Sequence, residues 1–182
     1  MKPIYIRRAR NKAMKFATAK HVPKGLKELE EDVPYRTHLA DVARIIMLAA
    51  LKTEKFDVRF AVQVALLHHT IEDKVATYKE LEHNFGEDIA EAVFAITKNE
   101  AQKKEQPTKD SLSRIRKLKS EVWAVKLADM ITNLQPPPLD WSKVQRINNH
   151  DEARLVLTEL GSGDTYLAKW LEDKMKEYVK YI

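Results

Sequence analysis

Four ionisable side chains are crowded into six residues near the middle of the sequence. In the segment AVQVALLHHTIED, His68 and His69 come directly after an apolar run, and Glu72 and Asp73 end the segment. In a helix, His68 and Glu72 would be i, i+4 neighbours, and so would His69 and Asp73. Burying such groups is unfavourable unless a divalent cation compensates them. The cluster predicts a metal site, and the alternative is the solvated end of a helix.

Two distant residues could complete the ligands of this site. His38 lies on the apolar side of an expected helix, within PYRTHLADVA, and Asp129 lies among apolar residues in AVKLADMITNL. Imidazole and carboxylate ligands, with positions left to water, suit Mn²⁺, Fe²⁺ or Zn²⁺ in a hydrolytic site. Spacing alone does not join these segments, because a lone histidine on an apolar stripe is more often a hydrogen-bonded core residue. A lone Asp129 could equally be a salt-bridged carboxylate.

Helices are the elements that must position these residues. Only four glycines occur, and apolar residues recur at helical spacing along the chain. The expected helices cover about 3–20, 37–51, 57–72, 77–86, 87–97, 109–133, 141–159 and 163–180. Residues 21–35 are expected to form a loop and the polar stretch 98–110 a mobile loop. No internal repeat or linker divides the chain, so we expect one all-α domain over residues 1–182.

Composition excludes several classes of protein. The chain has 182 residues, enough for one well-cored domain, and no cysteine, so disulfides and cysteine-based zinc sites or nucleophiles are excluded. No apolar run approaches the roughly 20 residues that span a bilayer. The basic N-terminus lacks the continuous apolar stretch of a signal peptide. We therefore expect a cytoplasmic protein without a membrane partner.

The net charge of +5 indicates a solvated surface, because both signs alternate along the helices. A nucleic-acid-binding protein would need a clustered basic face with aromatic stacking residues. Trp123, Trp141 and Trp170 are instead expected to be core anchors, so no nucleic-acid partner is expected. A positive net charge also raises the concentration of small anionic substrates near the protein surface, such as phosphorylated nucleotides.

Five ordered segments together resemble a known family. They are PYRTHLADVA, ALLHHTIED, FGEDIAEAV, ITK and VKLADMITNL. In this order and at these separations they resemble the HD-domain hydrolases of the RelA/SpoT superfamily, above all the small alarmone hydrolases. The resemblance covers about residues 13–160. It implies a single HD-domain bundle of eight to ten α-helices that hydrolyses the 3′-pyrophosphate of (p)ppGpp or a related nucleotide with Mn²⁺.

The same resemblance implies a set of metal ligands. The family's ligands map onto His38, His68, His69 and Asp129, and this chain departs from the family at one of them. His69 stands where the family has an aspartate, so the site has one negative charge fewer and a different geometry. The departure bears on metal affinity, on the choice of metal and on the acidity of a bound water.

Roles for other residues also follow from the resemblance. Glu72 and Asp73 map onto the family's pair that serves the attacking water and proton transfer, and Asn133 maps onto a residue that helps to hold the nucleotide. Lys126 and Arg44 are candidates for neutralising phosphate charge, although a surface role is commoner for each.

A second departure lies in residues 21–34, where the family has an Arg-Lys-rich turn that contacts the base. Here VPKGLKELEEDVPY is longer and acidic near its end. Lys24 and Lys27 could substitute, but base preference does not carry over. Two alternatives stay open: a catalytically decayed nucleotide-binding regulatory protein, and an HD phosphohydrolase of another nucleotide, such as a nucleoside monophosphate or NADPH. The sequence does not indicate an oligomeric state.

Overall fold

Every regular element is helical in the residues that this computed structural model describes, which are 3–21, 32–98 and 106–182. The α-helices are α1 (Pro3–His21), α2 (Asp32–Ala49), α3 (Val58–Leu67), α4 (Tyr78–Phe85), α5 (Glu87–Ile96), α6 (Gln106–Ile115), α7 (Ser120–Asn133), α8 (Lys143–Leu160) and α9 (Thr165–Tyr178). Short 3₁₀ turns, η1 (Gly161–Gly163) and η2 (Val179–Tyr181), flank α9. No helix among the described residues is long and apolar enough to cross a membrane. The prediction of an all-α fold is confirmed.

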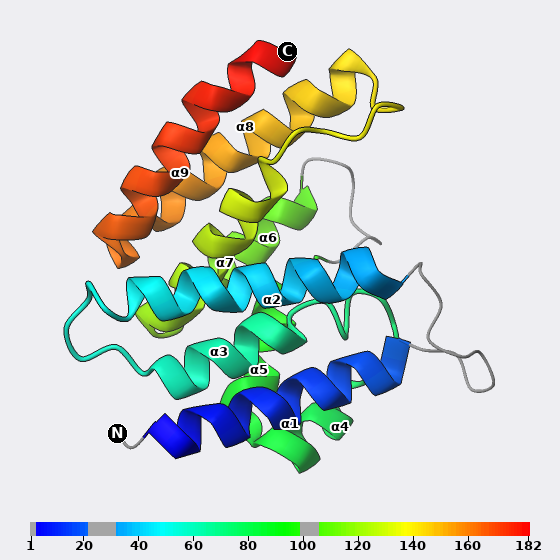
Figure 1. Cartoon of the computed structure of the whole chain (residues 1–182), viewed down its shortest axis with the longest axis vertical. Helices are drawn as coiled ribbons and strands as arrows, with labels where there is room; N and C mark the ends of the chain where they lie inside the picture. The colour runs from blue at the N-terminus through cyan, green and yellow to red at the C-terminus, as the bar shows by residue number, and fades with distance from the viewer. Residues whose placement is uncertain (1–2, 22–31, 99–105) are drawn as a thin grey trace.

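Helix α7 lies at the centre of the molecule. It packs against α2 and α3 on one side and against α8 and α9 on the other (Figure 1). Ten of its 14 residues are buried, and all but three of these are apolar. A helix that is apolar on nearly every side must be enclosed by others. Two of the polar exceptions, Lys126 and Asp129, are therefore held inside the protein.

Helix α3 is the centre of the N-terminal half. It packs against both α1 and α2, and the three helices lie side by side (Figure 1). Eight of its ten residues, from Phe60 to Leu67, are buried. At its start Asp57 accepts a hydrogen bond from the Phe60 amide, 3.1 Å away, which caps the helix. Anchored in this way, α3 places the residues that follow Leu67 next to α7.

The predicted helix over 57–72 is wrong at its end, because α3 stops at Leu67. The Thr70 hydroxyl donates to the Leu67 carbonyl oxygen at 2.7 Å, and the Thr70 carbonyl accepts the amide of Ala76 at 2.9 Å. Lys74 then adopts a left-handed backbone with φ of 59°. Residues 68–74 are consequently a series of turns, in which the Asp73 amide still donates to the His69 carbonyl oxygen at 2.8 Å but no regular helix continues.

The predicted helix over 109–133 is also wrong, because it is two helices, α6 and α7. The Leu118 amide donates to the Ile115 carbonyl at 2.9 Å, which tightens the end of α6. The Leu118 carbonyl accepts a hydrogen bond from the indole Nε1 of Trp123 at 3.0 Å. These bonds satisfy backbone groups where the chain changes direction.

The two predicted loops are wrong where they meet helices. Residues 32–35 belong to α2 and 106–110 to α6, while 22–31 and 99–105 lie outside the described residues. Each helix has a proline in its first turn, Pro34 or Pro107, where the missing N–H removes no helical hydrogen bond. Proline at these two positions therefore marks the start of a helix and not the interior of a loop.

Gly163 provides a test of the packing that holds α7. A Cβ built on Gly163 would lie 2.9 Å from Cε3 and 3.0 Å from Cβ of Trp123. We expect Gly163→Ala to lower the free energy of unfolding by about 1–3 kcal/mol, because the bulky Trp123 side chain, which packs against the core, would have to shift. Urea unfolding followed by circular dichroism measures the change.

Gly161→Ala is the matched control. Its Cβ would meet only the flexible end of Leu157 at 3.3 Å and the Ala168 Cβ at 3.5 Å. We expect a change below about 1 kcal/mol. Equal losses in the two variants would contradict the close approach of η1 to α7.

Candidate metal centre

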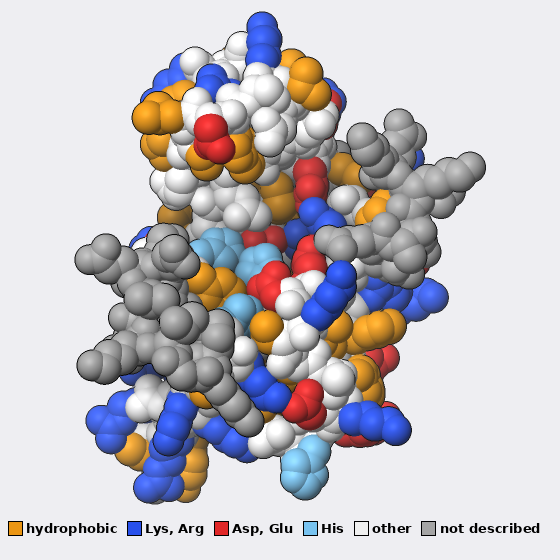
Figure 2. Space-filling view, turned by 90° about the vertical axis from the view of Figure 1, so that its right-hand side faces the viewer, with side chains coloured by type: hydrophobic (Ala, Val, Ile, Leu, Met, Phe, Trp, Pro, Cys, Tyr) orange, Lys and Arg blue, Asp and Glu red, His pale blue; other side chains and the backbone are white. Residues whose placement is uncertain are grey.

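Three histidines and one aspartate from distant parts of the sequence meet in the structure. His38 comes from α2, His68 and His69 follow α3, and Asp129 comes from α7. One nitrogen or oxygen atom of each lies within 4.8 Å of the others. Figure 2 shows histidine, acidic and basic side chains gathered in a hollow at mid-height of the molecule. The structure thus brings together all four predicted ligands.

The spacing of these atoms suits a cation between them. Asp129 Oδ1 lies 3.4 Å from His38 Nε2 and 3.7 Å from His68 Nε2. The Nε2 atoms of His38 and His69 are 3.3 Å apart. Ligands about 2.1 Å from a tetrahedral ion are separated by about 3.4 Å. The widest separation of 4.8 Å leaves room for additional ligands such as water.

The outer hydrogen bonds of two histidines direct lone pairs toward this point. His68 Nδ1 lies 2.7 Å from the Ala65 carbonyl oxygen, and because a carbonyl only accepts, Nδ1 carries the proton. His38 Nδ1 lies 3.4 Å from the hydroxyl of Thr132, which itself donates to the Asp129 carbonyl. The Nε2 of His68 is buried with no hydrogen-bond partner. Lone pairs that face a buried carboxylate repel it unless a cation lies between, so the residues fit a metal ion.

Lys126 keeps the central carboxylate ionised. Its Nζ donates to Asp129 Oδ2 at 2.8 Å, and both side chains are buried. Burial alone would raise the pKa of Asp129, but the ammonium of Lys126 outweighs it and holds that pKa well below its usual range. Asn133 Nδ2 donates to Oδ1 at 3.0 Å. The carboxylate is therefore charged and fixed in direction.

His69 is held in its neutral form. Burial, followed by the neighbouring His68, lowers the pKa of His69 to about 2. Its Nδ1 lies 3.9 Å from Glu72 Oε2, and its Nε2 faces His38. A neutral imidazole is the form that binds metal. His69 is thus poised as a ligand although it replaces the family's aspartate.

The two candidate acid–base residues lie in different surroundings. Glu72 lines the cavity beside the cluster, and burial raises its pKa against the opposing effect of Lys126. Asp73 does not line this cavity; its Oδ2 lies 3.0 Å from His21 Nε2, and its side chain is 43% exposed. Helix α3 ends before these residues, and the ion-pair contact of His69 is with Glu72, at 3.9 Å.

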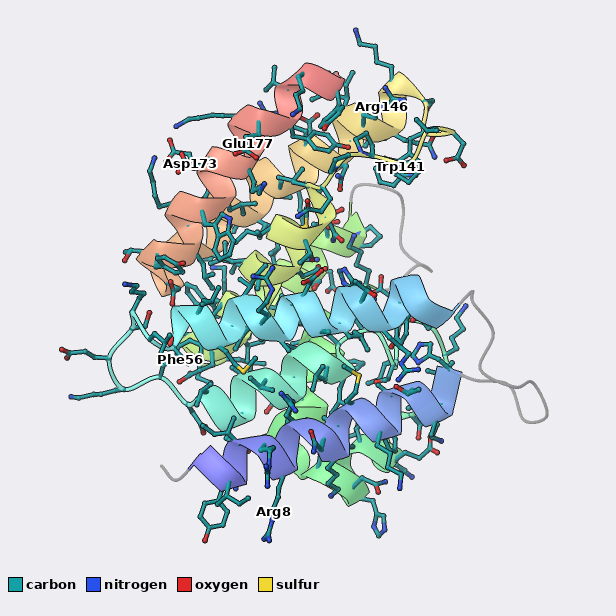
Figure 3. The ribbon with its side chains drawn as sticks, in the orientation of Figure 1. Arg8, Phe56, Trp141, Arg146, Asp173 and Glu177 are labelled. Atoms are coloured by element: carbon teal, nitrogen blue, oxygen red, sulfur yellow. The ribbon has the colours of Figure 1, made fainter. Side chains whose placement is uncertain are left out.

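A cavity of about 420 Å³ adjoins the cluster. Lys98 lines it and forms an ion pair with Glu152 at 2.7 Å. Sequence reasoning missed both residues, although Lys98 belongs to the ITK segment, while no motif marked Glu152. Trp141, between α7 and α8 (Figure 3), lines the cavity as well, so its prediction as a core anchor is wrong.

Other sequence-predicted residues are placed as follows. Asn133 and Lys126 line the cavity. Arg44 does not: its side chain is 57% exposed, and its Nε pairs with Asp41 at 3.3 Å on the same helix. Trp123 and Trp170 pack against the hydrophobic core, as predicted.

Comparison with known proteins identifies the family. The HD domain matches residues 13–157, most of the chain. The chain belongs to the HD domain family. This HD domain is 33% identical over 141 residues to the guanosine-3′,5′-bis(diphosphate) 3′-pyrophosphohydrolase MESH1 of Danio rerio, and the match covers 75% of each chain. The Mus musculus protein of the same name is 31% identical over 170 residues, covering 91% and 92% of the two chains.

A solved structure shares the fold of this HD domain. It is that of a metazoan ortholog of SpoT, a protein that hydrolyses ppGpp and plays a role in starvation responses. The two structures superpose with a TM-score of 0.75 at 22% sequence identity, over 93% of this chain and 94% of the other. The resemblance seen in the five sequence segments is confirmed.

Asp129→Asn tests the candidate metal centre of this HD domain. In the native chain we expect a bound divalent cation at 100 times its dissociation constant to raise the free energy of unfolding by about 2.7 kcal/mol. Asp129→Asn should abolish that rise. It should also lower metal-free stability by about 3–5 kcal/mol, because Lys126 stays buried without its main counter-ion. Chemical unfolding with metal or chelator measures both effects.

Asp151→Asn is the control, because Asp151 is exposed and pairs with Arg154 at 2.7 Å, on the same helix. It should leave unchanged both the stabilisation by metal and the stability of the metal-free protein. Undiminished stabilisation by metal in Asp129→Asn would place the cation elsewhere.

Proposed function

We propose that this HD domain is a divalent-metal-dependent hydrolase that removes the 3′-pyrophosphate from (p)ppGpp or a related alarmone nucleotide. One observation carries the proposal: three imidazoles and a buried carboxylate converge beside a cavity of about 420 Å³ that Glu72 and two lysines also line. That combination suits hydrolysis of a phosphate ester or anhydride. Similarity to proteins named as guanosine-3′,5′-bis(diphosphate) 3′-pyrophosphohydrolases supports the substrate class.

His38, His68, His69 and Asp129 would hold the metal, for which the resemblance implies Mn²⁺. A cation held there would act as a Lewis acid and lower the pKa of a bound water. The four side chains are already oriented to bind a cation. The outer hydrogen bonds of His38 and His68 direct their lone pairs toward the centre of the cluster, and Lys126 keeps Asp129 charged.

Glu72 is proposed as the general base. Its carboxylate is buried enough that its pKa is raised, so it holds a proton more readily at neutral pH than an exposed glutamate. Asp73 is proposed to pass the proton on to solvent, because its side chain is 43% exposed and pairs with His21. Acid–base groups of this kind contribute about 10²–10⁴-fold to the rate.

Phosphate charge would be met by two lysines. Lys126 is fixed by Asp129, whereas the Lys98 side chain is 28% exposed and can exchange Glu152 for a phosphate oxygen. Asn133 lines the same cavity and is proposed to help hold the nucleotide. Arg44 lies outside the described cavity lining, so its contact with phosphate stays a prediction.

Product analysis tests the proposed function. Purified protein is incubated with ppGpp, ppApp, GMP or NADPH, with and without metal. We expect metal-dependent release of pyrophosphate from ppGpp or ppApp. Phosphate release from GMP or NADPH alone would make this an HD phosphohydrolase of another nucleotide. Tight nucleotide binding without turnover with any metal would instead indicate a catalytically decayed regulatory protein.

Glu72→Gln tests the proposed base. The amide is similar in size but cannot take a proton, so kcat should fall by about 10²–10⁴-fold. Metal content, measured by atomic absorption, should not change. Glu82→Gln, on the exposed face of α4, is the control and should retain activity. Full turnover by Glu72→Gln would assign the base to another residue.

A further inference from the structure

The centre contains three imidazoles and only one carboxylate. The additional imidazole belongs to His69, and the structure turns it into the cluster rather than away from it. Its Nε2 lies 3.3 Å from His38 Nε2, and its ring centroid lies 4.0 Å from that of His68. A histidine merely tolerated at this position would not need to point its nitrogen at the other ligands.

We propose that His69 is a metal ligand that shifts the preference of this centre from manganese toward zinc. The inference rests on the metal centre assigned above, but not on the hydrolysis of any nucleotide. It concerns the relative affinity of the same four side chains for two cations of equal charge.

The direction of the shift follows from the chemistry of the donors. A second carboxylate attracts any divalent cation largely through its charge, and it suits hard ions such as Mn²⁺. An imidazole contributes no charge and binds through its nitrogen lone pair, which suits Zn²⁺ and Fe²⁺ better than Mn²⁺. Most protein sites already bind Zn²⁺ more tightly than Mn²⁺. We therefore propose that His69 increases the ratio of the zinc to the manganese association constant.

The surroundings of His69 favour that role. Its Nδ1 lies on the side of Glu72, 3.9 Å from Oε2, and its Nε2 lies 3.3 Å from His38 Nε2, so Nε2 is the nitrogen that faces the other candidate ligands. The side chain is only 28% exposed, which limits the other rotamers it can adopt. With three neutral ligands and one carboxylate, a bound divalent cation keeps a net charge of +1. That residual charge adds to the attraction for a phosphorylated ligand.

The test is a metal competition with no nucleotide present. Zn²⁺ and Mn²⁺ are titrated into the metal-free native chain, His69→Asp and His83→Asp, against a chromophoric chelator. We expect His69→Asp to lower the ratio of the zinc to the manganese association constant by about tenfold or more. His83→Asp is the matched control, because His83 is exposed on α4; it should keep the native ratio. An unchanged or higher ratio in His69→Asp would overturn the proposal.

A second measurement needs no variant. In the Co²⁺-loaded native chain, every imidazole ligand gives one exchangeable N–H proton with a large paramagnetic shift. Three such signals are expected, one for each of His38, His68 and His69, and two signals would overturn the proposal. Both experiments read metal binding alone. An absence of nucleotide hydrolysis would therefore count against the proposed function and leave this inference standing.

Discussion

The buried ion pair between Lys126 and Asp129 is the interaction on which the candidate site depends. Nζ and Oδ2 are 2.8 Å apart inside the central helix α7, where both side chains are almost fully buried. A charge of either kind alone would be strongly unfavourable there, so each residue requires the other. The pair uses one carboxylate oxygen and leaves the other, Oδ1, directed at His38 and His68. A constraint of the core thereby fixes the first ligand of the site.

The end of α3 supplies the complementary constraint. Adjacent residues in a regular helix point about 100° apart, so His68 and His69 would start from different faces of a continued helix. The hydroxyl of Thr70 holds the Leu67 carbonyl at 2.7 Å, and turns replace the helix from His68 onward. Both imidazoles then reach the cluster, while Asp73 swings toward His21. The end of α3 and the turns that follow it therefore lie at the site.

The clustering of the four side chains was predicted better than the backbone that carries them. Periodicity locates helices through their apolar stripe, and Ile71, one turn after Leu67, continues the stripe beyond the residue where α3 ends. The break between α6 and α7 lacks glycine and proline, and the hydrogen bond there, from the indole of Trp123 to the Leu118 carbonyl, leaves no mark in the apolar pattern. Glu152 and Trp141 line the cavity because α8 and the segment before it pack on α7. Such packing cannot be read from the sequence. The clustering of His38, His68, His69 and Asp129 was predicted only by resemblance, because no local pattern encodes it.

The proposed function and the role of His69 both require a cation lying among these four side chains. Its most direct test is a crystal structure of the metal-loaded protein, with diffraction data collected on both sides of the absorption edge of the bound metal. We expect one anomalous peak within about 2.0–2.2 Å of the three Nε2 atoms and of Asp129 Oδ1. A fully ordered cluster without a peak, or a peak bound elsewhere with His69 turned away, would contradict the account.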